Sequence, residues 1–256
     1  NTIFLEEKIK CVASCFEFLK SLKSFRLEYL THLQSRITSE AFHTLVSELK
    51  HLKALEILYF LFPANNDFSV EREFENFTLS LKNLSLLRTL NLDFRCAISD
   101  KILYELFTAL KCISGLSSFF LNSTNFSQVT KTGIKYLADS LSVLSDLSYL
   151  KLNIFQMNDL LDKVLEALAL ALIDNSSLTR LELCYSQGLI MDKRILSLAK
   201  CIKTLVHLEY FSLSCQDCKI PTNEVEVLRQ SLKSLKSLSN YSCSFKDVYL
   251  DFRNQE

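Results

Sequence analysis

Cysteine and histidine are the residues with which this sequence could build a metal, redox or nucleophilic site. Cys215 and Cys218 have the C-x-x-C spacing of half a zinc site or of a redox pair. The sequence holds no second C-x-x-C pair, and Cys215 falls on a predicted strand position that points into the core. The histidines are scattered and form no Ser/His/Asp or Cys/His arrangement: His32, His43, His51 and His207. We therefore expect no enzyme activity, no metal and no cofactor.

Tyrosine, arginine and phenylalanine carry much of the binding energy of protein interfaces. Tyr149, Arg180 and Tyr210 follow one another at spacings of 31 and 30 residues, and Phe120, Lys151 and Glu182 at spacings of 31. In a parallel stack of strands, equal offsets place these side chains in two adjacent columns. We predict a protein-binding surface formed by six residues: Phe120, Tyr149, Lys151, Arg180, Glu182 and Tyr210. The alternative is that these side chains satisfy one another's interactions and bind no partner, with Arg180 stacked between the tyrosines and Lys151 paired with Glu182.

Short strands must position these residues, and an internal repeat supplies them. Apolar residues alternate with period two from eight anchors spaced 29 to 35 residues apart: Phe25, Leu55, Leu90, Phe119, Leu150, Leu181, Phe211 and Tyr241. Three, six, nine and thirteen residues before each anchor the chain is again apolar, apart from Asn175. Within the strands, Ser123 is the one exception. This spacing predicts a helix before each strand.

Each unit is therefore helix, tight turn, short strand and loop. Stacked units bury their leucines together, with the strands about 4.8 Å apart and the helices about 10 Å apart, which bends the stack into an arc with the strands on its concave face. In the second unit the pattern places Leu55, Ile57 and Tyr59 in the core, followed by a surface loop over 61–73. At the C-terminal end, Val248, Leu250 and Phe252 alternate like a short strand.

The segments LSLLRTLNLDF (84–94), LSDLSYLKLNI (144–154) and NSSLTRLELCY (175–185) resemble leucine-rich repeats of the ribonuclease-inhibitor type. The segment LAKCIKTLVHLEYFSL (198–213) is similar to the long repeat arrays abundant in ciliate proteomes. The resemblance implies an α/β horseshoe of about eight repeats that spans 1–256 as a single domain. It implies a binding role without naming the partner. The chain starts at Asn1 inside a repeat, so we expect it to be part of a longer chain.

Composition excludes several classes of protein. Lys and Arg total 29, equal to Asp and Glu, which argues against a nucleic-acid or acidic-membrane partner because such binders need a basic surplus. No apolar stretch is long enough to span a membrane. Three glycines are too few for glycine-rich nucleotide loops. Nine scattered cysteines indicate reduced thiols in an intracellular, cytoplasmic location.

We conclude from the sequence that the protein is a non-catalytic scaffold that binds a protein partner on its concave strand face. One alternative is a structural subunit of a cytoskeletal, axonemal or other multiprotein assembly, located at the cytoskeleton or cilium. Another is a GTPase-regulating repeat protein, in which Arg95 or Asn125 at the strand ends would act. No sequence feature singles out either residue.

Overall fold

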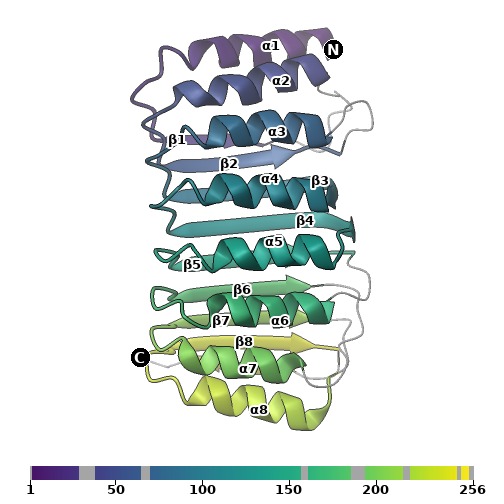
Figure 1. Cartoon of the computed structure of the whole chain (residues 1–256), viewed down its shortest axis with the longest axis vertical. Helices are drawn as coiled ribbons and strands as arrows, with labels where there is room; N and C mark the ends of the chain where they lie inside the picture. The colour runs from purple at the N-terminus through teal and green to yellow at the C-terminus, as the bar shows by residue number, and fades with distance from the viewer. Residues whose placement is uncertain are drawn as a thin grey trace.

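Helices and strands alternate in the described part of the chain from the first helix to the eighth strand, and a ninth strand follows (Figure 1). The computed structural model describes residues 2–28, 38–64, 70–156, 161–185, 194–215, 220–246 and 249–253. The helices are α1 (Thr2–Cys15), α2 (Ser39–Glu48) with a 3-10 turn (Leu49–His51), α3 (Val70–Leu81), α4 (Asp100–Leu110), α5 (Lys131–Leu141), α6 (Leu161–Leu172), α7 (Arg194–Thr204) and α8 (Thr222–Lys233). The strands are β1 (Ser24–Leu27), β2 (Ile57–Phe62), β3 (Thr89–Ser99), β4 (Ser118–Gln128), β5 (Tyr149–Ile154), β6 (Arg180–Tyr185), β7 (Tyr210–Cys215), β8 (Asn240–Phe245) and β9 (Tyr249–Arg253).

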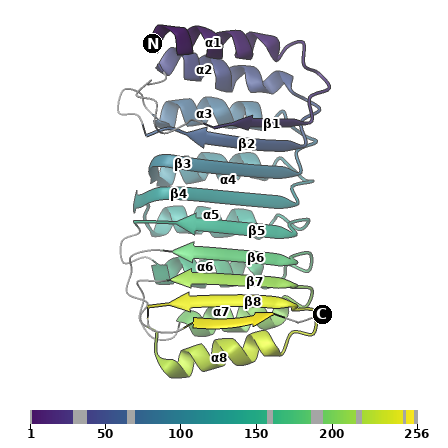
Figure 2. The same ribbon diagram turned by 180° about the vertical axis from the view of Figure 1, so that it is seen from behind.

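All these strands form one sheet, in which their spatial order equals their order in the sequence. Strands β1 to β8 pair in parallel. The helices line one face of the sheet, and no described helix lies over the other face, which we call the open face (Figures 1 and 2). The predicted continuous parallel sheet with helices on one side is confirmed for the described residues. The chain has a solenoid-like α/β repeat fold.

A ninth strand adds to the eight that the repeat pattern predicts. β9 returns antiparallel to β8, with Leu250 opposite Cys243 and Phe252 opposite Tyr241. The alternation of apolar residues near the C-terminal end indicated this strand, although Val248 lies outside the described residues. β9 therefore closes the C-terminal edge of the sheet (Figure 2).

The prediction for the second unit is wrong by three residues. Leu58 and Phe60 pair with Leu90 and Leu92 of β3 and are buried, whereas Ile57 and Tyr59 lie on the open face. Leucines three residues apart before the strand fit two repeat frames equally well. A shift by three, an odd number, moves every strand side chain to the opposite face.

The surface loop predicted over 61–73 is correspondingly shorter. Leu61 and Phe62 belong to β2, and 70–73 form the first turn of α3. Residues 65–69, including the predicted Asn65-Asn66-Asp67 segment, lie outside the described residues.

Phenylalanines fill the core between α2, α3 and the first strands. Phe62 stacks on Phe94 with ring centroids 4.6 Å apart, and Phe60 lies 4.9 Å from Phe77. Phe42 and Phe74 complete this buried cluster. The shifted frame of β2 is stabilised here, because it is the frame that buries Phe60 and Phe62 among the other rings.

Two polar residues define the ends of elements. Ser99 caps α4, accepting a hydrogen bond from the backbone N–H of Ile102. Asn175, the polar exception in the apolar rows, accepts hydrogen bonds from the N–H groups of Ser177 and Leu178 at 3.0 and 2.9 Å. Its amide donates to the carbonyl of Leu144 in the preceding unit at 3.3 Å. Asn175 is therefore a turn cap rather than a defect in the core.

No described helix is long and apolar enough to cross a membrane.

Candidate protein-binding surface

The six predicted site residues lie on four neighbouring strands of the open face. In the sheet register Tyr149 is opposite Arg180, and Arg180 is opposite Tyr210. Lys151 is flanked in the same way by Phe120 and Glu182. The two predicted columns are therefore present and adjacent. Successive side chains of a strand point to opposite faces of the sheet, and these six residues occupy the positions that face away from the helices.

Aromatic and cationic groups of these columns are in direct contact. The Arg180 guanidinium lies over two rings, 4.8 Å from the centroid of Tyr149 and 4.2 Å from that of Tyr210. Phe120 meets Tyr149 edge to face, with centroids 4.5 Å apart. These contacts hold the four side chains in one continuous layer on the open face.

The Glu182 carboxylate joins the two columns. It accepts hydrogen bonds from the Tyr149 hydroxyl and from Arg180 Nε, both at 2.7 Å, and pairs with Lys151 Nζ at 2.7 Å. Only 13% of the Glu182 side chain is exposed, against 37% for Lys151 and 44% for Arg180. The polar groups therefore satisfy one another internally, while the rings and cations remain partly exposed.

Titration of the cluster follows from these contacts. Burial raises the pKa of Glu182, but the hydrogen bonds from Lys151, Tyr149 and Arg180 outweigh it, so the pKa lies below its ordinary value of 4.5. Burial and the hydrogen bond to Glu182 raise the pKa of Tyr149 to about 12. At neutral pH Glu182 is therefore a carboxylate and Tyr149 a neutral phenol.

A hollow on the open face adjoins the cluster, and sequence reasoning missed it. Its volume is about 200 Å³, and Phe120 and Lys151 form one of its walls. Tyr59 and Arg26 form the opposite wall, where the Arg26 guanidinium lies 5.0 Å from the centroid of the Tyr59 ring. The sequence prediction placed Tyr59 in the core. With Leu58 as the second anchor, the spacing is 33 residues from Phe25 and 32 residues to Leu90, whereas Leu55 gives 30 and 35. The more even spacing could have revealed the correct frame.

Amide and carboxylate side chains form part of the lining of the hollow. Asp93 receives a hydrogen bond from Asn122 Nδ2 at 3.0 Å and pairs with Arg95 at 2.9 Å. Burial raises the pKa of Asp93 in spite of Arg95. Asn122 Oδ1 is buried without a hydrogen-bond partner in the structure. Asn153, which is opposite Asn122 on the next strand, also lines the hollow. The lining of the hollow therefore combines polar side chains with aromatic ones.

No group of three or more His, Cys, Asp or Glu side chains in the described ranges is arranged to hold a metal ion. Cys215 is buried, as its strand position predicts, and Cys218 lies outside the described residues. Burial raises the pKa of Cys201 and of Cys243 to about 12, so these two thiols behave as small apolar side chains.

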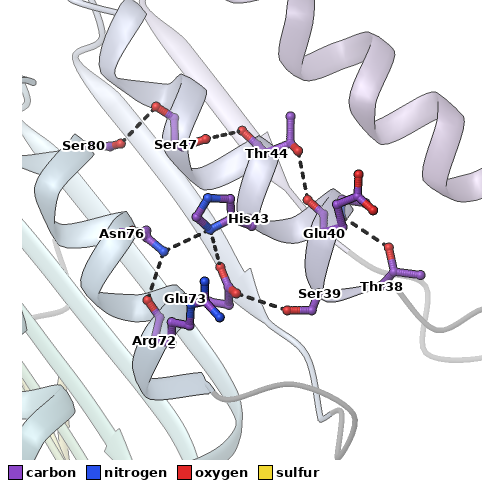
Figure 3. A network of polar contacts seen from close by, with 11 residues as sticks. Thr38, Ser39, Glu40, His43, Thr44, Ser47, Arg72, Glu73, Asn76 and Ser80 are labelled. Atoms are coloured by element: carbon purple, nitrogen blue, oxygen red, sulfur yellow. Dashed lines mark hydrogen bonds and ion pairs between the residues drawn. The ribbon is translucent and has the colours of Figure 1, made fainter.

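His43 lies on the helical side of the molecule in a polar network between α2 and α3 (Figure 3). Its Nδ1 is 3.1 Å from Glu73 Oε2 and 3.0 Å from Asn76 Nδ2, while Ser39 donates to Glu73 Oε1 at 3.1 Å. The Glu73 carboxylate is buried, and the hydrogen bond from the Ser39 hydroxyl compensates part of its lost hydration. Serine and histidine both contact the carboxylate rather than each other, so the network joins two helices and contains no nucleophile–base pair.

No protein-family model matches the chain, and no curated protein matches it either. The class of the protein is therefore defined by its fold and its surface: a solenoid-like α/β repeat fold whose open face carries an aromatic and cationic cluster beside a hollow.

Proposed function

We propose that the protein is a non-catalytic interaction scaffold of the leucine-rich repeat, ribonuclease-inhibitor-like type, which binds a protein partner on its open face. The observation that carries the proposal is the cluster around Arg180 and Glu182 with the hollow beside it, on a sheet face that no described helix covers. The leucine-rich type is supported by one helix and one parallel strand in each unit, with leucines at constant positions.

The arrangement suits protein recognition for two physical reasons. The aromatic rings and the Arg180 guanidinium are fixed by their mutual contacts before any partner arrives, so binding costs little side-chain entropy. The hollow, which Tyr59 and Phe120 help to line, can receive a side chain of the partner, and its polar lining residues can exchange hydrogen bonds with that side chain.

The alternative functions receive less support from the same contacts. A GTPase-regulating role would use Arg95 or Asn125, but Arg95 pairs with Asp93 and Asn125 Oδ1 accepts hydrogen bonds within its own turn from Ser127. A structural subunit of a larger assembly remains the second version of the scaffold proposal, since it would use the same open face. The buried thiols of Cys201 and Cys243 support an intracellular location.

The test compares partners recovered by affinity purification and identified by mass spectrometry. Tyr149→Ala combined with Arg180→Ala should weaken binding of a recovered partner by about 2 kcal/mol, or roughly 30-fold in Kd, if these residues are hot spots. Tyr59→Ala tests the hollow separately. Circular dichroism checks that each variant remains folded.

The matched control reverses charge on the helical side, with Lys131→Glu combined with Lys135→Glu on α5, where both residues are exposed. These changes should leave binding unaffected. A partner lost by the α5 variant and kept by the Tyr149/Arg180 variant would show that the helical face binds and that the proposal is wrong.

A further inference from the structure

The N-terminal end of the solenoid exposes an apolar surface that every other unit buries. We call it the N-terminal end face and define it by five residues of the first unit: Val12, Leu19, Leu22, Phe25 and Leu27. Val12 is 47% exposed and Leu19 is 42% exposed, and the other three are half-buried. The end face thus runs from α1 across the turn to β1.

The units that follow provide an internal comparison. The residues equivalent to Val12 are at most 1% exposed: Leu45, Phe77, Leu106, Leu137, Leu168, Leu198 and Leu228. The apolar residues equivalent to Leu19 are at most 8% exposed: Leu52, Leu84, Ile113, Leu144, Leu205 and Leu235. In these units the side chains belong to the buried core, and each helix and strand contacts the helix and strand of the unit before. The same positions are uncovered in the first unit because no unit precedes it in the structure.

Backbone hydrogen bonds between consecutive units repeat once in each unit, and this series stops at the N-terminal edge of the sheet. At each turn two consecutive N–H groups donate to one carbonyl of the preceding unit; Glu56 and Ile57 donate to Lys23 at 2.8 and 2.9 Å. The series continues through every later unit, ending with Ser239 and Asn240, which donate to Glu209 at 2.9 and 3.2 Å. Among the described residues the series begins with Glu56 and Ile57. The equivalent N–H groups of Lys23 and Ser24 lie at the edge of the sheet, where the described part of the chain contains no preceding unit to accept them.

The two ends of the molecule differ. At the C-terminal end β9 covers the edge of β8, and Tyr241, Cys243 and Phe245 are at most 6% exposed. A second copy of the chain therefore cannot offer an open parallel strand from its C-terminal end. Two N-terminal end faces related by a twofold axis with their helices on the same side would meet with antiparallel β1 strands, which does not continue the parallel hydrogen-bond series.

We propose that the N-terminal end face is a docking surface for a further α/β repeat unit, distinct from a second copy of this chain. Its strand would run parallel to β1 and accept the N–H groups of Lys23 and Ser24, and its helix would lie beside α1 and cover Val12 and Leu19. This is the interface that already joins each pair of consecutive units, continued by one step. The inference rests on the fold and does not depend on the function proposed for the open face.

The test adds a repeat unit to the full chain. A copy of residues 131–160, which carries the regular fifth unit, is fused in front of Asn1, and amide hydrogen exchange is followed across Ser24–Leu27. Docking should slow exchange of these amides at least about tenfold relative to the unfused chain. The control fusion carries Val12→Lys and Leu19→Lys and should show no slowing.

A second fusion with two copied units, residues 100–160, is measured in parallel, because a single added unit can stay unfolded without a neighbour of its own. If neither fusion slows exchange in β1, the proposal is wrong. Light scattering on the unfused chain measures whether it is a monomer or a dimer. A monomer is expected, whereas a dimer that Leu19→Lys dissociates would show that a second copy is the occupant and would overturn the proposal.

Discussion

Glu182 shows how one carboxylate organises the candidate surface at the scale of single residues. It accepts from Tyr149, Arg180 and Lys151, which come from β5 and from β6 itself. Without it, two cations and a phenol would lose their acceptor while remaining partly desolvated. The sequence predicted only the pair with Lys151, because register alone does not reveal how far the Tyr149 hydroxyl reaches.

Replacing Glu182 by Gln should lower the free energy of unfolding by about 1 kcal/mol at pH 7, because three charge-assisted hydrogen bonds become weaker. The pKa of Glu182 is lowered in the folded state, so its contribution is complete above the ordinary value of 4.5 and is lost as the pH falls through the lowered value. Urea unfolding at pH 7 and pH 3 measures both effects. Glu166→Gln, at an exposed pair on α6, is the control and should change stability by less than about 0.5 kcal/mol. Equal losses in the two variants would contradict this account.

Asn175 gives a second prediction at this scale. Asn175→Leu should destabilise the protein by about 1–2 kcal/mol, because the turn N–H groups of Ser177 and Leu178 lose their acceptor. From the sequence alone a neutral or stabilising effect is expected, since leucine restores the apolar row. Asn175→Asp keeps the acceptor oxygen and should cost less. Thermal unfolding decides the matter, and a leucine variant as stable as the parent would show that the cap contributes nothing.

Each helix–strand unit buries its leucines against its neighbours rather than within itself. Leu150 and Leu181 are fully buried in successive strands and occupy the same repeat position. The helices before them are amphipathic, and their apolar faces meet the same core. Stability at the scale of elements is therefore shared between consecutive units.

Leu150→Ala or Leu181→Ala should each lower the free energy of unfolding by about 2–5 kcal/mol, because a cavity opens in a packed core. Leu170→Ala on α6 is the matched control: this leucine is 68% exposed, so its truncation should cost less than about 0.5 kcal/mol. Chemical denaturation measures the three variants. A large loss in the control, or none in the core variants, would contradict the placement of these leucines.

β9 supports the last unit in the same way. Deleting residues 247–256 should expose Cys243, which is 0% exposed and opposite Leu250. Thiol labelling followed by peptide mass spectrometry should show Cys243 reacting at least about tenfold faster, while buried Cys201 on α7 reacts at its former rate. If Cys243 stays unreactive after the deletion, the core of the last unit is shielded without β9 and the prediction is wrong.

Across the whole molecule the stack is one-dimensional, because each unit contacts mainly the units before and after it. A unit in the middle has two such interfaces, and the first unit has one in the structure. β1 is also the edge strand of the sheet, next to the exposed Val12 and Leu19. Stability should therefore fall toward the N-terminal end.

Amide hydrogen exchange should show this gradient, with the slowest amides in β4 to β7 and the fastest of the strand amides in β1. β8 should stay protected, because β9 covers its edge. Uniform exchange from β1 to β8 would indicate a single cooperative unit and contradict the prediction.

The repeat and its α/β alternation were readable from the sequence because they depend on local periodicity: three and four for a helix, two for a strand. That periodicity also placed Tyr149, Arg180 and Tyr210 side by side, since the units around them are almost equal in length. In the second unit, Leu49, Leu52 and Leu55 fit two frames, and packing of Phe60 and Phe62 against Phe77 and Phe94 stabilises the observed one. This long-range choice moved Tyr59 to the open face and created the hollow. The contacts of Glu182 with Tyr149 and Lys151 and the hydrogen bond from Asn175 to Leu144 likewise join neighbouring units, so they exist only once the units have stacked.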